Sequence, residues 1–256
     1  MVACLTGCLH AQQREAGTEL LEARRETQVV LDRMDHDLAE AAQQIGQLGK
    51  LSGEETRQIL RRYCLLHPFV VECATVHRNG QIVVAEPEYY KSLEGTDVRA
   101  QEQIIRLHGT LRPVFSNTIL LVEETPAADL QQPVFLRDGS FLGSVSNIIR
   151  PADLLGEILM PFVGSDRYLW VMDTTGLILF DPIKSEVGRN VFRQPPYSES
   201  EEFISVALRM AATPSGEGAY TLPRQGMADT TQKRILWETV GLHGTQWRIA
   251  LVQEIG

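Results

Sequence analysis

Three polar residues of this sequence have side chains that suit the recognition of a small polar molecule. Arg99 offers a planar guanidinium that can hold a carboxylate with two parallel hydrogen bonds. Asn117 and Asn147 stand near the ends of expected strands, where their amides can both donate and accept. Such groups bind a ligand through charge and hydrogen bonding.

The motifs of common catalytic sites are absent. The sequence holds no HExxH, no GxSxG, no glycine-rich phosphate loop ending in Gly-Lys-Ser/Thr and no CxxC pair. The histidines are scattered, and each is assigned a structural role first: His10, His36, His67, His77, His108 and His243. We therefore predict a protein that is not an enzyme and holds neither cofactor nor metal. A hydrolase assembled from dispersed Ser, His and Asp is the enzymatic alternative.

The cysteines fall into two pairs with different expected roles. Cys8 ends the stretch Leu5–Cys8, which resembles the lipobox of bacterial lipoproteins, although the charged and apolar segments of a signal peptide are missing before it. Lipidation of Cys8 and an unstructured leader are the two interpretations. Cys64 and Cys73 are expected at the end of a helix and in a strand. A disulfide between them requires Cα atoms within about 7 Å, and two buried free thiols are the prediction.

Length and composition define the broad class. The chain has 256 residues, of which 43% are hydrophobic, so it can bury a sizeable core in one or two domains. Its net charge of -9, with acidic and basic residues interspersed, argues against nucleic acid as a partner. No apolar run approaches the roughly 20 residues of a membrane-spanning helix. We expect a soluble chain unless a lipid anchor holds it at a membrane.

One pattern occurs twice along the chain. Each copy has a strand, a turn that ends in glycine, a second strand and a Gly-x-x-Val segment. The copies are 69–98, with Arg78-Asn79-Gly80 and Gly95–Val98, and 168–191, with Asp173–Gly176 and Gly188–Val191. Each continues through a helical segment into late strands that turn back at Asp138-Gly139 or His243-Gly244. The repeat predicts two similar sheet modules in tandem.

The remaining elements frame these modules. The expected parts are a leader (1–17), N-terminal helices (18–66), a first sheet module (67–150), a linking helix (151–165) and a second sheet module (166–256). The long helix expected over 18–48 carries a narrow apolar seam with heptad spacing, which either packs against its own chain or pairs two copies in a homodimer. Trp170, Trp237 and Trp247 fall in strands of the second module and indicate a filled core there.

The order of these parts resembles a double Cache sensor, an extracytoplasmic relative of the PAS fold. The resemblance implies an α+β fold in which a long N-terminal helix precedes two antiparallel-sheet modules, one membrane-distal and one membrane-proximal. The similar stretches are Glu94–Val98, Gly109–Ser116 and Pro133–Val145 in the first module, and Asp173–Pro182, Val187–Val191 and Thr245–Ala250 in the second.

The resemblance also implies a binding site in the distal module, between the sheet and the segment after the first hairpin. The residues implied are Tyr89, Tyr90, Arg99, Gln101, Glu102, Phe115, Asn117 and Asn147. Amino-acid-binding members of the family follow the arginine with a Trp-Tyr pair and carry an aspartate on the last strand. Here only Arg99 matches that pattern, so a carboxylate, another small metabolite and the absence of any ligand remain alternatives.

The function expected from the resemblance is extracytoplasmic sensing of a small organic molecule for signal transduction, at a membrane to which Cys8 tethers the chain. Since the sequence ends at Gly256 without a kinase, cyclase or methyl-accepting segment, we expect either a fragment of a longer receptor or a sensor that acts on a separate signalling protein. The alternatives are a solute-binding lipoprotein that serves a transporter and a scaffold without a ligand.

Overall fold

The fold was obtained as a computed structural model, which describes residues 2–120, 125–164, 166–223 and 230–255; the side chains of 1–14, 120, 223 and 230 are outside the described part. The predicted leader residue Cys8 and its lipobox therefore lie outside the described side chains. The chain divides into two compact units. Unit 1 comprises residues 1–29, 155–241 and 246–256, and unit 2 comprises 30–154 and 242–245.

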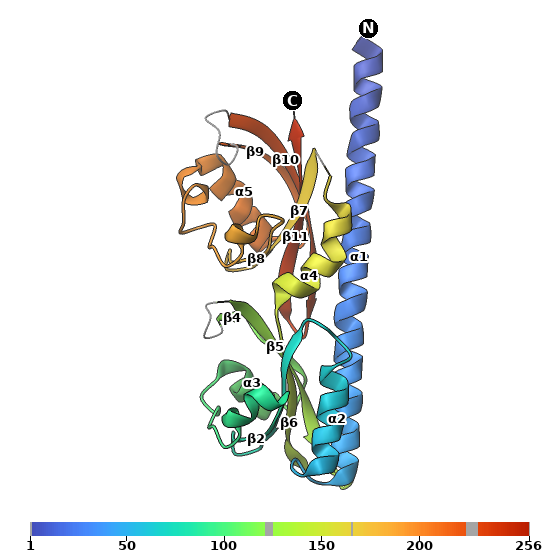
Figure 1. The fold of residues 1–256 in the computed structure, drawn as a ribbon. Helices are drawn as coiled ribbons and strands as arrows, with labels where there is room; N and C mark the ends of the chain where they lie inside the picture. Colours follow the sequence, from blue (N-terminus) through green and yellow to red (C-terminus); the bar gives the residue numbers. More distant parts are fainter. Residues whose placement is uncertain (1, 121–124, 165, 224–229, 256) are drawn as a thin grey trace. The chain divides into compact units, whose positions relative to one another are not determined.

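The elements follow the predicted order (Figure 1). The helices are α1 (Val2–Leu48), α2 (Glu54–Cys64), α3 (Glu102–Thr110), α4 (Pro151–Leu159) and α5 (Glu201–Ala212), with 3₁₀ helices η1 (Glu88–Leu93), η2 (Met160–Phe162), η3 (Lys184–Glu186) and η4 (Tyr197–Glu199). The strands are β1 (Val70–His77), β2 (Ile82–Glu86), β3 (Val114–Phe115), β4 (Ile119–Leu120), β5 (Pro126–Phe135), β6 (Phe141–Ile149), β7 (Arg167–Asp173), β8 (Ile178–Phe180), β9 (Gly216–Pro223), β10 (Thr230–Leu242) and β11 (Thr245–Ile255).

The two units contain sheets of the same topology. Unit 2 has the strand order β2-β1-β6-β5-β3, with β4 paired to β5, and unit 1 has the order β8-β7-β11-β10-β9. The prediction of an α+β fold with two antiparallel-sheet modules behind a long helix is confirmed.

The repeat seen in the sequence is reproduced by backbone hydrogen bonds. In unit 2 the amide of Val98 donates to the carbonyl of Gly80 at 2.8 Å, and in unit 1 the amide of Val191 donates to Gly176 at 2.9 Å. Both glycines have φ near +85°, which side chains rarely adopt. A Cβ would also collide with Arg99 at Gly80 and with Phe192 at Gly176. The glycine turn thus folds the Gly-x-x-Val segment back onto its own hairpin in each copy.

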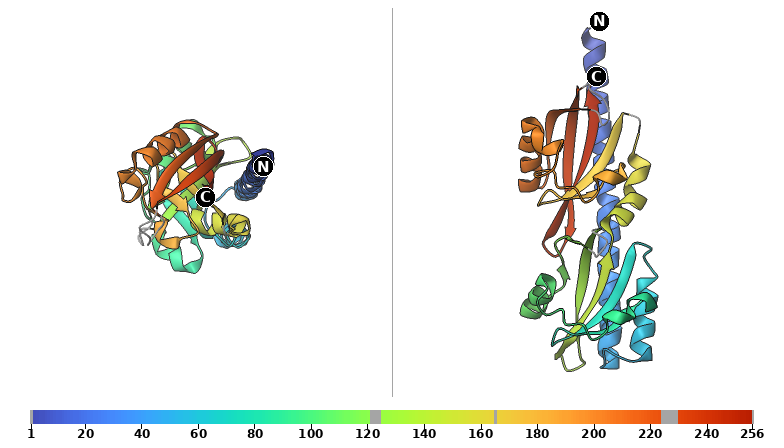
Figure 2. Two further views of the ribbon diagram at one scale, coloured as in Figure 1. Left: turned by 90° about the horizontal axis from the view of Figure 1, so that it is seen from above. Right: turned by 60° about the vertical axis from the view of Figure 1, so that its left-hand side comes forward.

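Each sheet is covered on both faces (Figures 1 and 2). In unit 2, α3 and η1 lie on one face, whereas α2 and the second half of α1 lie on the other. In unit 1, α5 covers one face, and α1 reaches the other through Gln28, which hydrogen-bonds the backbone of Gly241. Side chains on both faces of these strands are buried, so each face of the sheet must be covered by another element that excludes water.

The apolar seam of α1 packs within the chain. Leu31, Met34, Leu38 and Ile45 are fully buried, although Leu48 at the end of the helix is exposed. This burial fits the first of the two predicted roles of the seam, which was packing against its own chain. Leu21 and Val29 of the same helix are also exposed, and they lie on other faces than this seam.

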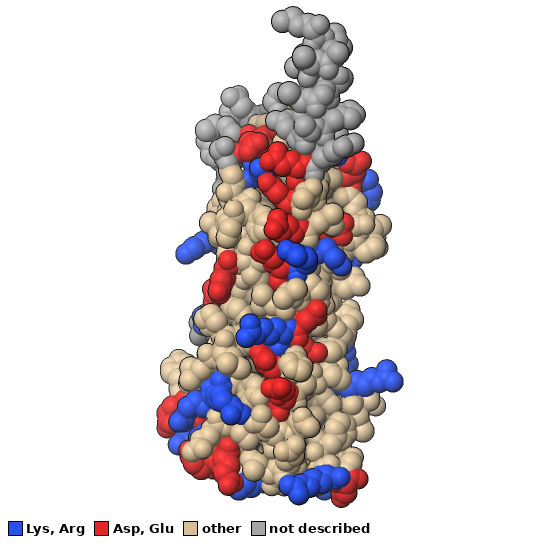
Figure 3. Space-filling model, turned by 90° about the vertical axis from the view of Figure 1, so that its right-hand side faces the viewer, with Lys and Arg blue, Asp and Glu red and all other residues tan. Residues whose placement is uncertain are grey.

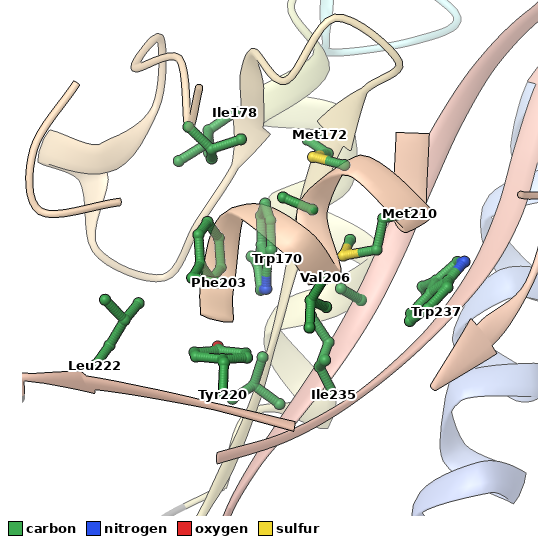
Figure 4. Packing of buried hydrophobic residues seen from close by; sticks show 14 residues of the cluster. Trp170, Met172, Ile178, Phe203, Val206, Met210, Tyr220, Leu222, Ile235 and Trp237 are labelled. Carbon is green, nitrogen blue, oxygen red and sulfur yellow. The ribbon is translucent and has the colours of Figure 1, made fainter. Parts of the chain in front are cut away.

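The core of unit 1 is aromatic and closely filled (Figure 4). Trp170 of β7, Phe203 of α5 and Tyr220 of β9 pack together, with the Phe203 and Tyr220 ring centroids 5.0 Å apart and edge to face. Trp237 of β10 joins the same cluster and donates its indole N–H to the carbonyl of Thr213. The prediction that the tryptophans fill the second module agrees with this burial.

The prediction that Cys64 and Cys73 are free thiols is wrong, because the structure joins them in a disulfide. Cys64 is the last residue of α2 and Cys73 lies in β1, on the face that α2 covers. Their Cα atoms are 5.8 Å apart, inside the range that a disulfide spans. The sequence spacing alone did not reveal that the helix end packs directly on the strand.

Candidate functional site

The face of the unit 2 sheet beneath α3 carries a group of polar residues that we call the polar face: Glu72, Gln103, Asp129, Gln131, Ser144 and Ser146. Register places them together. Asp129 of β5 and Glu72 of β1 both pair with Ile148 of β6, so their side chains leave the sheet on the same side. Gln131 pairs with Ser146 on that side, one step along each strand.

Asp129 lies at the centre of the polar face. Its Oδ2 accepts from Gln131 Nε2 at 2.6 Å and from Gln103 Nε2 of α3 at 3.2 Å. Ser146 also hydrogen-bonds this carboxyl group. Asp129 is only 3% exposed, and burial raises its pKa to about 6 although these hydrogen bonds act to lower it.

Glu72 adds a second carboxyl group to this face. Burial, followed by the negative charge of Asp129, raises the pKa of Glu72 to about 7. No Lys or Arg among the described residues lowers the pKa of either group. Two carboxyl groups in a poorly solvated place without a counter-charge form a site that favours a proton or another cation.

Several acceptors of the polar face have no hydrogen-bond partner among the described residues. They are Oδ1 of Asp129, Oε1 of Gln131 and Oγ of Ser144. Gln131 is 1% exposed and Ser144 is 0% exposed, so solvent does not reach these residues. Buried polar atoms in folded proteins almost always have a partner, and exceptions of this kind mark places where a water or ligand belongs.

Apolar residues continue the same face. Ala74, Val76 and Ile82 pack with Ile104 of α3, and Tyr90 of η1 packs against this group from its partly buried position. The face therefore combines an apolar part near β2 with a polar part near β5. This mixture of apolar walls and a few convergent polar groups is typical of small-molecule sites.

The sequence-derived site residues do not all reach this face. Tyr90 packs on its apolar part, and Gln101 accepts from Gln103, the residue that contacts Asp129. Phe115 and Asn147 both pair with Leu130 of β5. Their side chains therefore lie on the opposite face of the sheet, which α1 and α2 cover. Asn147 Oδ1 has no partner there among the described residues.

The other four residues point to solvent. Tyr89 is 81% exposed, and its ring lies edge to face with the ring of Tyr90. The Arg99 side chain is 73% exposed and donates to Asp97 Oδ2 at 2.7 Å. Glu102 pairs with Arg106, one helical turn further along α3. Asn117 is exposed after β3.

Sequence reasoning missed Asp129, Gln131 and Glu72. Their signal was available, because Glu72, Asp129 and Gln131 are polar residues inside strands whose other members are mainly apolar or small. Polar residues at alternate positions of a strand normally indicate a solvent-facing side. This side of the sheet is buried because α3 covers it, and the sequence did not predict that α3 lies over β5.

Comparison with known proteins defines the class. Residues 29–151 match the family described as HK/GC/chemotaxis protein-like, sensor domain. None of the curated proteins matches the sequence. An extracellular ligand-binding receptor from Desulfohalobium retbaense is 34% identical and superposes with a TM-score of 0.75 over 91% of this chain. The chain spans only 39% of the length of that receptor.

More distant structures share the fold. The ligand-binding domain of the Pseudomonas aeruginosa amino acid chemoreceptor PctC, in complex with GABA, is 15% identical, with a TM-score of 0.65 over 94% of this chain and 99% of its own. The domain of the Pseudomonas fluorescens chemoreceptor CtaA, in complex with L-serine, is 13% identical, with a TM-score of 0.69 over 96% and 98%.

These findings confirm the resemblance to Cache-type sensors. The chain has the double Cache fold, and its residues 29–151 are similar to the HK/GC/chemotaxis protein-like sensor domain. The predicted class, a sensing domain of signal transduction, is thereby confirmed. Among the described residues, no helix is long and apolar enough to cross a membrane.

Proposed function

We propose that unit 2 binds a small organic molecule on its polar face and that this binding is the signal the domain senses. The observation that carries the proposal is the set of buried acceptors without partners: Asp129 Oδ1, Gln131 Oε1 and Ser144 Oγ. A ligand that donates hydrogen bonds to them removes the desolvation penalty that these atoms otherwise carry. No group of three or more His, Cys, Asp or Glu side chains that could hold a metal ion is found in the described part of the chain.

The contrast between the two units supports this location. On the corresponding face of unit 1, Trp170, Phe203 and Tyr220 pack against one another. Unit 2 has Ala74 where unit 1 has Trp170, and its neighbouring strands present Ser146 and Gln131. A ligand in the distal unit therefore takes the place that aromatic side chains fill in the other.

We also propose that binding reaches the rest of the receptor without catalysis. The hydrogen bond from Gln103 to Asp129 connects α3 to β5. Gln132, the residue between Gln131 and Pro133, donates to Asp35 of α1 at 2.6 Å. A shift of β5 on binding thus acts directly on the long helix. The signalling partner, lipid attachment at Cys8 and a homodimer through helix 18–48 are further proposals, which rest on the sequence.

One structural feature supports an extracytoplasmic location, and a second bears on nucleic acid as a partner. The Cys64–Cys73 disulfide persists in oxidising compartments and is rare in the cytosol. Acidic and basic side chains are mixed on the face shown in Figure 3, where no basic patch suited to nucleic acid gathers.

The proposal is tested by thermal denaturation of the purified chain against amines, amino acids, organic acids and purines. A compound that binds only the folded state raises the melting temperature, and the increase grows with the logarithm of its concentration over Kd. We expect at least one compound to do so in the wild type and to fail in Asp129→Asn. A compound that stabilises both proteins equally binds elsewhere and contradicts the proposed site.

A further inference from the structure

We propose that the ligand of the polar face is an amine without a carboxylate, such as a primary alkylamine or diamine. This inference rests on the proposed function and narrows it to one chemical class. Its first support is the chemistry of the unpaired atoms. Asp129 Oδ1 and Gln131 Oε1 are pure acceptors, and the Ser144 hydroxyl can accept. A primary ammonium has three N–H donors and no acceptor, which matches this set.

Charge is the second support. The polar face holds two carboxyl groups, Glu72 and Asp129, which oppose each other across β6 and act on each other electrostatically. A positively charged ligand supplies the counter-charge that both carboxyl groups lack. A neutral donor such as an alcohol would satisfy hydrogen bonds and leave the two negative charges uncompensated, so it is the weaker candidate.

The third support is that Arg99 and Arg106, the two arginines within four residues of Gln103, are already engaged by other groups. Arg99 is held outside by Asp97, which accepts from both its backbone amide at 3.0 Å and its Nε at 2.7 Å. Arg106, on the same helix as Gln103, is committed to Glu102 and to the carbonyl of His243. Neither carboxyl group of the polar face is paired with a described cation.

An α-carboxylate brought beside the ammonium would therefore lie close to Asp129 and Glu72 without a counter-ion. Like charges held close in a poorly solvated site repel strongly. The site accordingly distinguishes an amine from the amino acid that differs from it only by a carboxylate. This is specificity by repulsion, since the shared part of the two molecules makes the same contacts.

The experiment compares such matched compounds by isothermal titration calorimetry and thermal denaturation at pH 8. The probes are ethanolamine with serine, putrescine with ornithine, agmatine with arginine, and succinate as an anion. We expect at least one amine to bind about tenfold or more tightly than its amino acid. Asp129→Asn should abolish that binding, whereas Arg99→Ala should leave the affinity unchanged.

Two results separate the inference from the proposed function. If an amino acid or succinate binds best, and Asp129→Asn abolishes its binding, the site stands and the amine class is wrong. If no probe or library compound binds, the proposed function itself fails. Because Asp129→Asn could perturb the fold, Glu72→Gln serves as the second variant; it removes the other charge at a less buried position and should weaken amine binding about tenfold.

Discussion

Ala74 and Trp170 occupy the same position in the two copies of the repeat. Each stands at the same distance before its turn glycine, Gly80 or Gly176, and each pairs with a small residue of the next strand, Ser146 or Ala250. The two units therefore differ in what covers an otherwise equivalent sheet face. In unit 1 the indole of Trp170 covers this face, whereas in unit 2 the same position carries only the methyl group of Ala74.

Enlarging Ala74 should block the site. We expect Ala74→Leu to abolish ligand-induced stabilisation, because the added atoms enter the face that carries Asp129 and Gln131. Overpacking of a buried position costs about 1–3 kcal/mol of unfolding free energy, which chemical denaturation of the ligand-free protein measures. The matched variant Trp170→Ala should lose about 3–5 kcal/mol and leave ligand affinity in unit 2 unchanged. Ligand binding by Ala74→Leu at wild-type affinity would place the site elsewhere.

The stability of the ligand-free protein should fall as the pH rises from about 5 to 8. Glu72 and Asp129 have pKa values raised to about 7 and about 6, so the folded state binds protons that the unfolded chain has released. Their contribution to stability is complete below their ordinary pKa values and is lost as the pH passes 6 and 7. Thermal denaturation across this range measures the effect.

Ligand binding should show the opposite pH dependence. An ammonium ligand requires ionised carboxylates, so the increase in melting temperature that it causes should grow from pH 5 to 8. Asp129→Asn and Glu72→Gln together should remove the pH dependence of the ligand effect and reduce the slope of the ligand-free curve. Part of the ligand-free slope should remain, because burial also raises the pKa of Asp181 in unit 1 to about 6, whereas the lowered pKa of His108 acts in the other direction. A ligand effect that is constant with pH would contradict a role for the two carboxylates.

The sequence was sufficient to predict the fold class, the repeat and the element order, because these depend on local signals. Gly80 and Gly176 punctuate equivalent hairpins, and the apolar seam from Leu31 to Ile45 indicates the helix. The site depends instead on which face of a strand another element covers. Phe115 and Asn147 are near the predicted site in sequence order, yet strand parity directs both to the face under α1 and α2.

The disulfide should contribute measurably to stability. Cys64 and Cys73 are 9 residues apart, and closing a loop of this size stabilises the folded state by about 3 kcal/mol in the chain-entropy model. The double variant Cys64→Ser, Cys73→Ser should lose about that amount in chemical denaturation. A reducing agent should lower the melting temperature of the wild type and leave the double variant unchanged. Equal stability of the two proteins without reductant would show that the cross-link is absent.

Among the charged groups of unit 2 outside the polar face, we expect the buried carboxylate of Glu86 to contribute most to the free energy of unfolding. Glu86 is 1% exposed and bonds Arg57 at 2.9 Å and Arg61 at 3.1 Å, which links α2 to β2. Burial acts to raise its pKa, but hydrogen bonds from Arg61 and Arg57 hold that pKa below its ordinary value. Its contribution to stability is therefore present at neutral pH and lost as the pH falls below about 4.

Replacing Glu86 by Gln should cost about 3 kcal/mol of unfolding free energy, the lower end for a broken buried ion pair. The lower end applies because Arg57 keeps Glu94 as a second partner and Arg61 is half exposed. The matched control is Glu88→Gln, whose exposed pair with Lys91 is worth less than about 1 kcal/mol. Urea denaturation at pH 7 distinguishes the two variants. Equal losses would mean that the α2–β2 ion pairs contribute no more than surface charges do.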